Sequence, residues 1–155
     1  MKSFIKITLI PVFLFVVLIA IEGKGIYVSM NGSDDAPGTL DKPVAGITAA
    51  SRLALPGDTV FVRSGGYHVK EQIRILSSGT PGHVITYMPY PGEEAAFNVD
   101  LIPWPQPKAG EHYSPTVGAL QIENVHHIKV EDIGIRYSHR AGIIIRNSSL
   151  SLIHI

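Results

Sequence analysis

The sequence predicts an all-β fold, a right-handed parallel β-helix in which each coil contains three short strands. After residue 57, short apolar runs follow one another, separated by Gly, Pro, Asn, Ser or Asp. Two of these runs, "ALQIEN" and "GIIIRN", align at an offset of 23 residues, with Ile122 over Ile145 and Asn124 over Asn147. The runs "HIKVE" and "GIRY" lie between them, so one period holds three strands. Coils whose strands pair in parallel with those of the next coil account for this repeat, and parallel crossovers are right-handed.

Residues 1–23 have the pattern of a secretory signal peptide. Lys2 and Lys6 give a positive start, and residues 7–21 are almost uninterrupted apolar sequence, which is short for a membrane span of about 20 residues. A small-x-small cleavage site is missing, so an uncleaved membrane anchor is the alternative; the expected cut lies near Gly23. Either way the rest of the chain is expected outside the cytoplasm. The cleaved form would be secreted, extracellular or periplasmic, with no membrane partner.

Residues 24–57 are expected to cap one end of the coils, beginning with a strand and a loop. Ile26–Val28 is a short strand candidate, and the loop "NGSDDAPGTLDKP" after it is rich in turn residues. Asp34 and Asp35 in this loop either bind a cation or are simply solvated. Calcium needs several convergent oxygens, and the loop has no recognisable calcium-binding spacing.

The segment "VAGITAASRLALPG" predicts a helix within this cap. Its predicted apolar face comprises Ile47, Ala50, Leu53 and Ala54. These positions recur at helical spacing, and Pro56-Gly57 ends the segment.

Residues 58–149 are expected to form the first coils, with three faces that repeat from coil to coil. Alternate residues of each strand point inward and stack about 4.8 Å apart. The predicted inward residues are Val60/Val62, Phe97/Val99 and Ile133/Ile135 on the first face, Ile73/Ile75, Leu120/Ile122 and Ile143/Ile145 on the second, and "VITYM" with Ile128/Val130 on the third. Asn124 and Asn147 at one corner predict a stacked amide ladder; the alternative is a coincidence of two turns, because Asn is common in turns.

The third face should recur near residue 150, but residues 150–155, "LSLIHI", fit the period poorly. Four residues after Asn124 the chain has inward Ile128, whereas four residues after Asn147 it has Ser151, so the alternation slips by one. The DNA string CTGTCTCTTATACACATCT, a transposon end used in preparing sequencing libraries, encodes the same residues when read from its first base. We therefore interpret residues 150–155 as a translated sequencing adaptor, with native sequence up to Ser149.

The composition excludes several kinds of partner. The 13 Lys and Arg balance the 13 Asp and Glu, and no basic patch indicates nucleic acid. The sequence has no cysteine, so disulfides and thiolate metal sites are excluded.

Two segments, "YVSMNGSDDAPGTLDKPVAGITAASRLALPGDTVFVRSGGY" and "SGTPGHVITYMPYPGE", resemble the N-terminal part of secreted right-handed parallel β-helix proteins. The resemblance is to the pectate lyase and chondroitinase B-like group of polysaccharide lyases, and it covers about residues 26–149. It implies β-elimination on an acidic glycan bound along the first face, with a cation or Arg neutralising the carboxylate and a Lys or Arg base taking the neighbouring proton. No base and no aspartate cluster of these families maps onto this chain. The resemblance therefore leaves the catalytic residues unassigned and implies calcium only in further coils.

The corner between the first and second faces carries variable connections, "SGGYHVKE", "DLIPWPQPKAGEHYSPTVG" and "YSHRAG". Because they belong to successive coils, they should lie along one edge. The candidate substrate-binding residues near this edge are Trp104, His112, Tyr113, Arg136, Tyr137, His139 and Arg140. Aromatic rings pack against the C–H faces of sugars, and an Arg fork matches a uronate carboxylate.

Each candidate also has a structural alternative. Trp104 and Tyr113 could anchor their own loop, with the histidines facing solvent. Arg136 could instead form an ion pair with Glu131 or Asp132.

The expected function is the N-terminal part of a secreted polysaccharide lyase that cleaves an acidic glycan, this part alone being inactive. A glycoside hydrolase on the same fold is one alternative, which paired carboxylates in further coils would indicate. A glycan-binding adhesin is the other, which binding without turnover would indicate.

Overall fold

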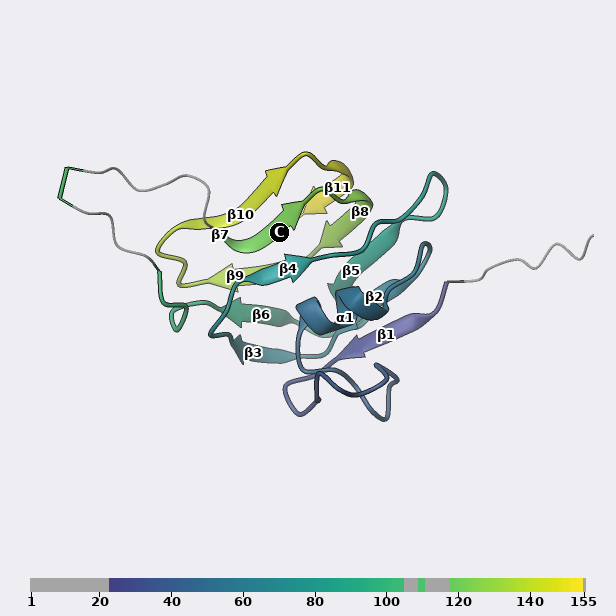
Figure 1. The fold of residues 1–155 in the computed structure, drawn as a ribbon. Coiled ribbons are helices and arrows are strands. Elements are labelled where there is room, and N and C mark those ends of the chain that lie inside the picture. Colours follow the sequence, from purple (N-terminus) through teal and green to yellow (C-terminus); the bar gives the residue numbers. More distant parts are fainter. Residues whose placement is uncertain (1–22, 105–108, 111–117, 155) are drawn as a thin grey trace, which may run out of the picture.

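The computed structural model describes residues 23–104, 109–110 and 118–154, whose strands wind around one axis (Figure 1). The elements in chain order are β1 (Gly25–Val28), α1 (Ile47–Leu53), β2 (Thr59–Val62), β3 (Gly65–His68), β4 (Ile73–Ile75), β5 (Ile85–Pro89), β6 (Ala95–Asn98), β7 (Gly118–Glu123), β8 (His126–Glu131), β9 (Ile133–Arg136), β10 (Ala141–Arg146) and β11 (Ser149–His154). They form three sheets with the strand orders β1-β2-β5-β8-β11, β3-β6-β9 and β4-β7-β10. Every pairing between neighbouring strands of these sheets is parallel, so the predicted all-β parallel β-helix is confirmed.

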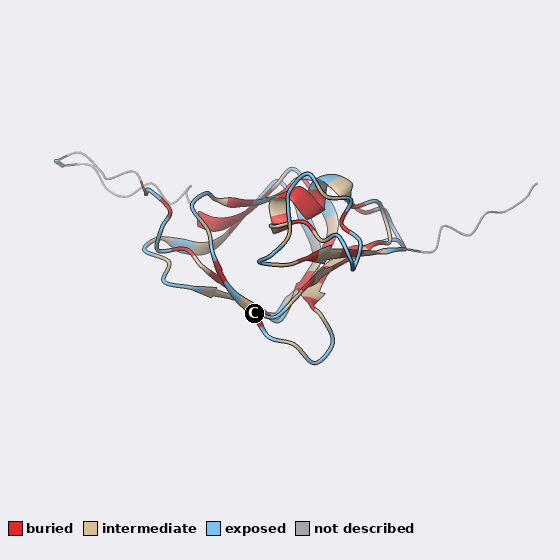
Figure 2. Ribbon diagram, turned by 90° about the horizontal axis from the view of Figure 1, so that it is seen from below, coloured by how far each residue is buried: buried red, intermediate tan, exposed pale blue. Residues whose placement is uncertain are grey.

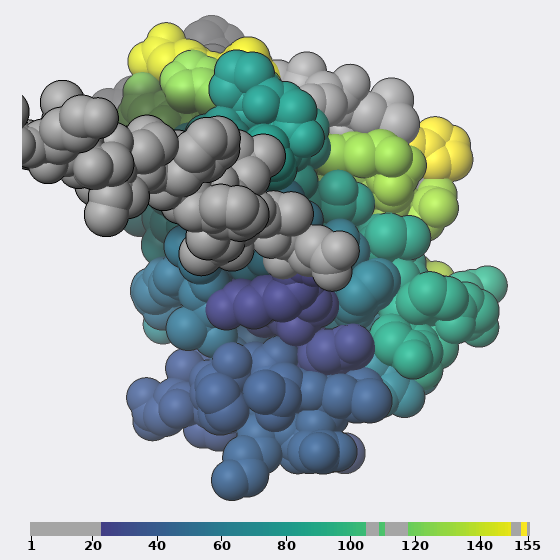
Figure 3. Space-filling view, turned by 90° about the vertical axis from the view of Figure 1, so that its right-hand side faces the viewer, coloured from purple at the N-terminus to yellow at the C-terminus, as the bar shows by residue number. Residues whose placement is uncertain are grey.

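The coils stack in the register that the sequence repeat predicts. Ile145 of β10 lies opposite Ile122 of β7, and Leu120 lies between Ile73 and Ile143 on the neighbouring strands. Seen along the coil axis, the buried segments are distributed around the enclosed interior (Figure 2). The space-filling view shows the chain advancing along the axis from the N-terminal cap to β11 (Figure 3).

One assignment of strands to faces is wrong. Val60 and Val62 were expected on the first face, but β2 pairs with β5 and therefore belongs to the five-stranded sheet, the third face. The first-face strand of this coil is β3, where Tyr67 lies opposite Phe97. Two glycines, Gly65 and Gly66, weaken the strand signal of this segment, which the sequence therefore presents as a connection.

Helix α1 lies against the outer edge of β4, where no other strand pairs within the described residues. The backbone N–H of Arg74 donates to Thr48 Oγ1 (3.0 Å), and the N–H of Leu76 donates to Ser51 Oγ (3.3 Å). Ser51 Oγ also donates to the carbonyl oxygen of Arg74 (3.3 Å). The helix thus satisfies backbone groups that an unpaired edge would leave open. Its predicted apolar face is confirmed, with Ile47, Ala50 and Ala54 buried and Leu53 packed against the core.

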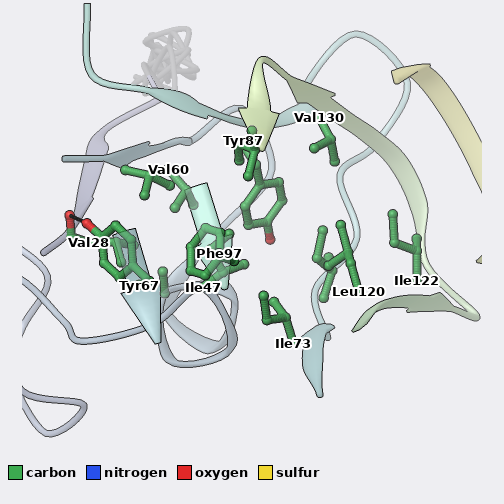
Figure 4. Close-up of a cluster of buried hydrophobic side chains, with 14 of the residues drawn as sticks. Val28, Ile47, Val60, Tyr67, Ile73, Tyr87, Phe97, Leu120, Ile122 and Val130 are labelled. Carbon is green, nitrogen blue, oxygen red and sulfur yellow. Dashed lines mark hydrogen bonds between the residues drawn. The ribbon is translucent and has the colours of Figure 1, made fainter. Parts of the chain in front are cut away.

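Two tyrosines inside the coils have different surroundings (Figure 4). The ring of Tyr67 stacks on Phe97, with centroids 4.8 Å apart. Its hydroxyl donates to the carbonyl oxygens of Arg63 (2.8 Å) and Val28 (3.2 Å). Tyr87 is fully buried, and its hydroxyl has no hydrogen-bond partner within the described residues. Burial raises the pKa of both side chains, that of Tyr67 to about 12.

The corner asparagines form one rung of the predicted amide ladder. Asn147 Nδ2 donates to Asn124 Oδ1 over 3.4 Å, and both residues have left-handed backbones, with φ values of 46° and 54°. Asn tolerates this conformation better than most residues, which explains its place at a tight corner.

The last described coil is less regular than the sequence predicts. Ile145 is 43% exposed, although it lies opposite buried Ile122. Its expected burial is therefore wrong, because no described strand pairs with the outer edge of β10. The pairing of β11 with β8 shifts register at Ser149/Leu150 and at Leu150/Leu152, where the sequence alternation slips.

No helix within residues 23–104, 109–110 and 118–154 is long and apolar enough to cross a membrane. The expected signal peptide lies almost entirely outside the described residues, and its cleavage stays a prediction.

Candidate functional site

The three variable connections leave the β3-β6-β9 sheet at the same end of its strands. Residues 69–72 join β3 to β4, residues 99–117 join β6 to β7, and residues 137–140 join β9 to β10. The strands at the ends of these connections stack in register, so the connections begin one above another along the axis, at the ends of β3, β6 and β9 in Figure 1. Of the second connection, the structure describes residues 99–104 and 109–110.

The structure separates the aromatic and histidine candidates at this edge. Tyr137 is 66% exposed and has a left-handed backbone, with φ of 61°. His139 beside it is exposed, whereas Arg140 is half-buried. Trp104 is only 9% exposed and belongs to the hydrophobic core. This burial supports an anchoring role for Trp104, while Tyr137 and His139 remain accessible to a ligand.

His112 and Tyr113 lie outside the described residues. Their placement on the edge and their role in binding stay predictions.

The outer face of the β3-β6-β9 sheet has a floor of small residues beside a polar row. Gly66, Ala96 and Gly134 lie opposite one another on successive strands, and so do His68, Asn98 and Arg136. Both rows point away from the core, because the alternate residues Tyr67 and Phe97 are buried. The small residues and Arg136 line a hollow of about 580 Å³ together with Glu94, Asp132 and His154, whereas His68 and Asn98 lie outside its lining. We call it the sheet-face hollow; its rows run along the coil axis, the direction in which a linear polymer would cross successive strands.

Arg136 is the cation of the sheet-face hollow. Its alternative partners are engaged elsewhere: Glu131 pairs with Lys129 (2.8 Å) and Asp132 with His154 (2.8 Å). None of the ion pairs between described residues includes Arg136, which is exposed at the end of β9. Its backbone is fixed, because its carbonyl oxygen accepts the N–H of Val99 (3.0 Å). Arg136 is thus an exposed cation beside the small-residue floor, in a lining that also contains Glu94 and Asp132.

A charged clamp joins two coils at another corner. Arg63 Nη2 lies 2.8 Å from Glu93 Oε1, and the guanidinium stacks over Tyr90 with its carbon 4.9 Å from the ring centroid. The hydrogen bond from Arg63, with that from the backbone N–H of Ser64, lowers the pKa of Glu93. This clamp holds the connections that precede β3 and β6, and it supports the sheet-face hollow from one side.

Metal ligands do not cluster in the described part of the chain, where no group of three or more His, Asp or Glu could hold an ion. Asp34 Oδ1 instead accepts the backbone N–H groups of Ala45 (3.1 Å) and Gly46 (3.2 Å), so it closes its loop. The calcium that the family resemblance implies belongs to further coils and stays a prediction.

A second hollow, which we call the helix-side groove, was missed by sequence reasoning. It has a volume of about 990 Å³, and its lining comes from α1, from the connection before β4 and from residues 102–104. Its charged and amide side chains are Asp34, Arg52, His68, Lys70, Glu71, Gln72, Arg74 and Gln121. Five of them belong to the single stretch from His68 to Arg74, whereas Asp34, Arg52 and Gln121 come from separate parts of the chain. The only sequence signal was that Arg74 and Gln121 occupy outward positions on neighbouring strands, where they lie opposite each other.

Residues 26–155 match the sequence model of a family described as "Pel9A-like, right handed beta helix region". The chain belongs to the Pel9A-like β-helix family. The right-handed winding predicted from the sequence is thereby confirmed, as is the resemblance to pectate lyase-like proteins.

Two curated relatives of this Pel9A-like chain are similar in sequence. The chain is 33% identical over 117 residues to the uncharacterized protein YwoF of Bacillus subtilis, a match that covers 74% of the chain and 23% of YwoF. It is 37% identical over 84 residues to pectate lyase PEL9 of Emericella nidulans, covering 54% of the chain and 20% of that enzyme. The chain thus spans less than a quarter of the length of either relative.

Two solved structures share the fold. A rhamnogalacturonan lyase matches 73% of the chain and 28% of its own, with a TM-score of 0.58 and 22% identity, which indicates the fold alone. The GH136 lacto-N-biosidase of Eubacterium ramulus matches 74% of the chain and 20% of its own, with a TM-score of 0.56 and 26% identity.

Proposed function

We propose that this chain is the N-terminal part of a secreted polysaccharide lyase that cleaves an acidic glycan by β-elimination. The proposal is carried by the exposed guanidinium of Arg136, which stands beside the small-residue floor of the sheet-face hollow in a chain similar to pectate lyase PEL9. Tyr137 and His139 follow it on the same edge. This combination suits a sugar polymer with carboxylates: the floor admits the chain, and the cation meets the charge.

The reaction would need charge neutralisation and a base. A base removes the proton from the carbon beside the carboxylate, a carbon–carbon double bond forms, and the bond to the leaving sugar oxygen breaks. Negative charge develops on the carboxylate as the proton leaves, and a nearby cation stabilises it. Arg136 would supply this stabilisation or bind a neighbouring sugar, while the base would come from coils beyond this chain.

The test uses the complete natural protein that contains these coils, incubated with polygalacturonate. We expect unsaturated uronate products, detected by their ultraviolet absorbance. Arg136→Gln should lower the rate at least about tenfold, because hydrogen bonds to charged groups contribute about 1.5–3 kcal/mol. Gly134→Leu should also lower it, because even a Cβ at this position would lie 3.2 Å from the Cβ of Ala96 and a larger side chain would fill the floor.

Lys129→Gln is the matched control, because it removes one positive charge from the five-stranded sheet instead. A rate that falls equally with Lys129→Gln would show that net charge, not the sheet-face hollow, determines turnover.

Two outcomes would favour other functions. The similarity to the GH136 lacto-N-biosidase makes a hydrolase the second candidate, and new reducing ends without a double bond would indicate it. Binding without turnover in the complete protein would indicate a glycan-binding adhesin.

A further inference from the structure

The helix-side groove contains a buried polar side chain with no protein partner. Gln121 on β7 is 9% exposed and lines the groove. No hydrogen bond of its carboxamide is found in the described part of the chain, whereas Gln72 nearby donates through Nε2 to the carbonyl oxygen of Gly118 (3.2 Å). The carboxamide therefore keeps its hydrogen-bonding groups open to the groove, where a ligand can reach them.

The charges around this amide indicate that the ligand is anionic. Arg74 lies opposite Gln121 on the neighbouring strand, so both side chains project into the groove together. Arg52 and Lys70 add two further cations to the lining. None of the ion pairs between described residues includes any of these three cations. Cations that form no ion pair are available to an anionic ligand.

Two acidic residues, Asp34 and Glu71, offset part of this charge, so three cations and two carboxylates leave the lining with one net positive charge when His68 is neutral. Asp34 binds two backbone N–H groups of its own loop, and Glu71 is an exposed residue in no described ion pair. The lining also has apolar residues, among them Ile102, Pro103 and Trp104. Apolar residues and cations in one lining suit a ring with a C–H face and a carboxylate, as in a uronic acid.

We propose that the helix-side groove is a second glycan site, which binds the end of a uronate oligosaccharide apart from the sheet-face hollow. Arg52 and Arg74 hold the carboxylate, and Gln121 bonds a ring hydroxyl. The substrate class rests on the proposed function, but the site requires no turnover.

The chain has a single tryptophan, and Trp104 lines this groove, so its fluorescence reports binding there. The purified protein is titrated with trigalacturonate, and with neutral galactotriose as the uncharged control. We expect a saturable change in Trp104 emission with the uronate alone. Arg74→Gln and Gln121→Met should each weaken binding about tenfold or more, since each removes a hydrogen bond to the ligand that is charge-assisted or buried. Arg136→Gln should leave this titration unchanged, and melting temperatures identify any variant that fails to fold.

The proposal is overturned by an uronate titration without saturable change, by an equal response to galactotriose, or by unaltered affinity in both groove variants. Failure of the lyase proposal looks different. Saturable Trp104 emission in this chain, with no unsaturated product from the complete natural protein, would refute the lyase alone. Product from the complete protein, with silent Trp104 emission in this chain, would refute this second site alone.

Discussion

Replacing Tyr67 and Tyr87 by Phe should change stability in opposite directions, although both rings are buried in the same core (Figure 4). Tyr67→Phe removes the hydrogen bonds to Arg63 (2.8 Å) and Val28 (3.2 Å). The single hydroxyl proton is shared between the two carbonyl oxygens, and removing it leaves buried acceptors short of a donor, at a cost of about 1–3 kcal/mol. The carbonyl oxygen of Val28 still accepts a hydrogen bond from the backbone N–H of Arg63 (2.9 Å) in the variant. The expected decrease in the free energy of unfolding therefore lies near the lower end of that range.

Tyr87→Phe removes a hydroxyl that is buried without a partner among the described residues. The desolvation cost of such a group is about 1–3 kcal/mol, so its removal should leave the free energy of unfolding unchanged or raise it. The ring keeps its shape, so no cavity forms other than the space of one oxygen atom.

Urea denaturation of the purified protein measures both changes. With slopes of about 1–3 kcal/mol per M for a small domain, a loss of about 1.5 kcal/mol lowers the midpoint by roughly 0.5–1.5 M. Tyr67→Phe should show this decrease, whereas Tyr87→Phe should hold or raise the midpoint. Equal destabilisation by the two substitutions would refute the reasoning, because the Tyr87 hydroxyl would then have a partner such as a buried water.

Two further predictions concern pH. Burial raises the pKa of Tyr67 to about 12, against about 10 in an unfolded chain, so its contribution to stability is complete below pH 10 and is lost as the pH rises toward 12. Between pH 10 and 12 the free energy of unfolding should therefore fall less steeply for Tyr67→Phe than for the unsubstituted protein. An identical slope would contradict the assignment. The hydrogen bonds from Arg63 and Ser64 lower the pKa of Glu93, so the clamp stabilises the fold above the ordinary pKa of Glu, about 4.3, and weakens as the pH falls through the lowered value. Glu93→Gln should therefore make the melting temperature depend less on pH in the acidic range. An unaltered dependence would show that the clamp contributes little to stability.

The sequence by itself determined the coil architecture of this protein. The alternation of inward and outward residues and the 23-residue offset between Ile122 and Ile145 are periodic signals in the sequence. Each stretch of chain that repeats these signals forms a coil that stacks on the preceding one in the same way. The helix at Ile47–Leu53 could also be predicted, because the helical spacing of its apolar residues and the Pro-Gly pair that follows it are local signals. The corner at Asn124 could be predicted because Asn tolerates a left-handed backbone.

Only the tertiary structure decided which strand of the first coil belongs to which face. β2 and β3 are separated by two residues, so the sequence places either of them on the first face. Pairing with β5 and β6 settles the choice, since parallel partners lie a whole coil away along the chain. The weak strand propensity of Gly65 and Gly66 is overridden by that pairing.

The chemistry of the candidate sites depended on the same long-range stacking. Arg136 was identifiable as an outward cation, but its freedom from Glu131 and Asp132 follows from where Lys129 and His154 lie. The helix-side groove is lined by Arg52, Arg74 and Gln121, which are separated in the sequence. They lie together because α1 packs against one edge of β4 and β7 pairs with the other edge. Whether a side chain points into or out of the coil depends on the alternation along its own strand, which the sequence shows. The residues that the side chain contacts belong to the neighbouring coil, and alternation along one strand does not reveal them.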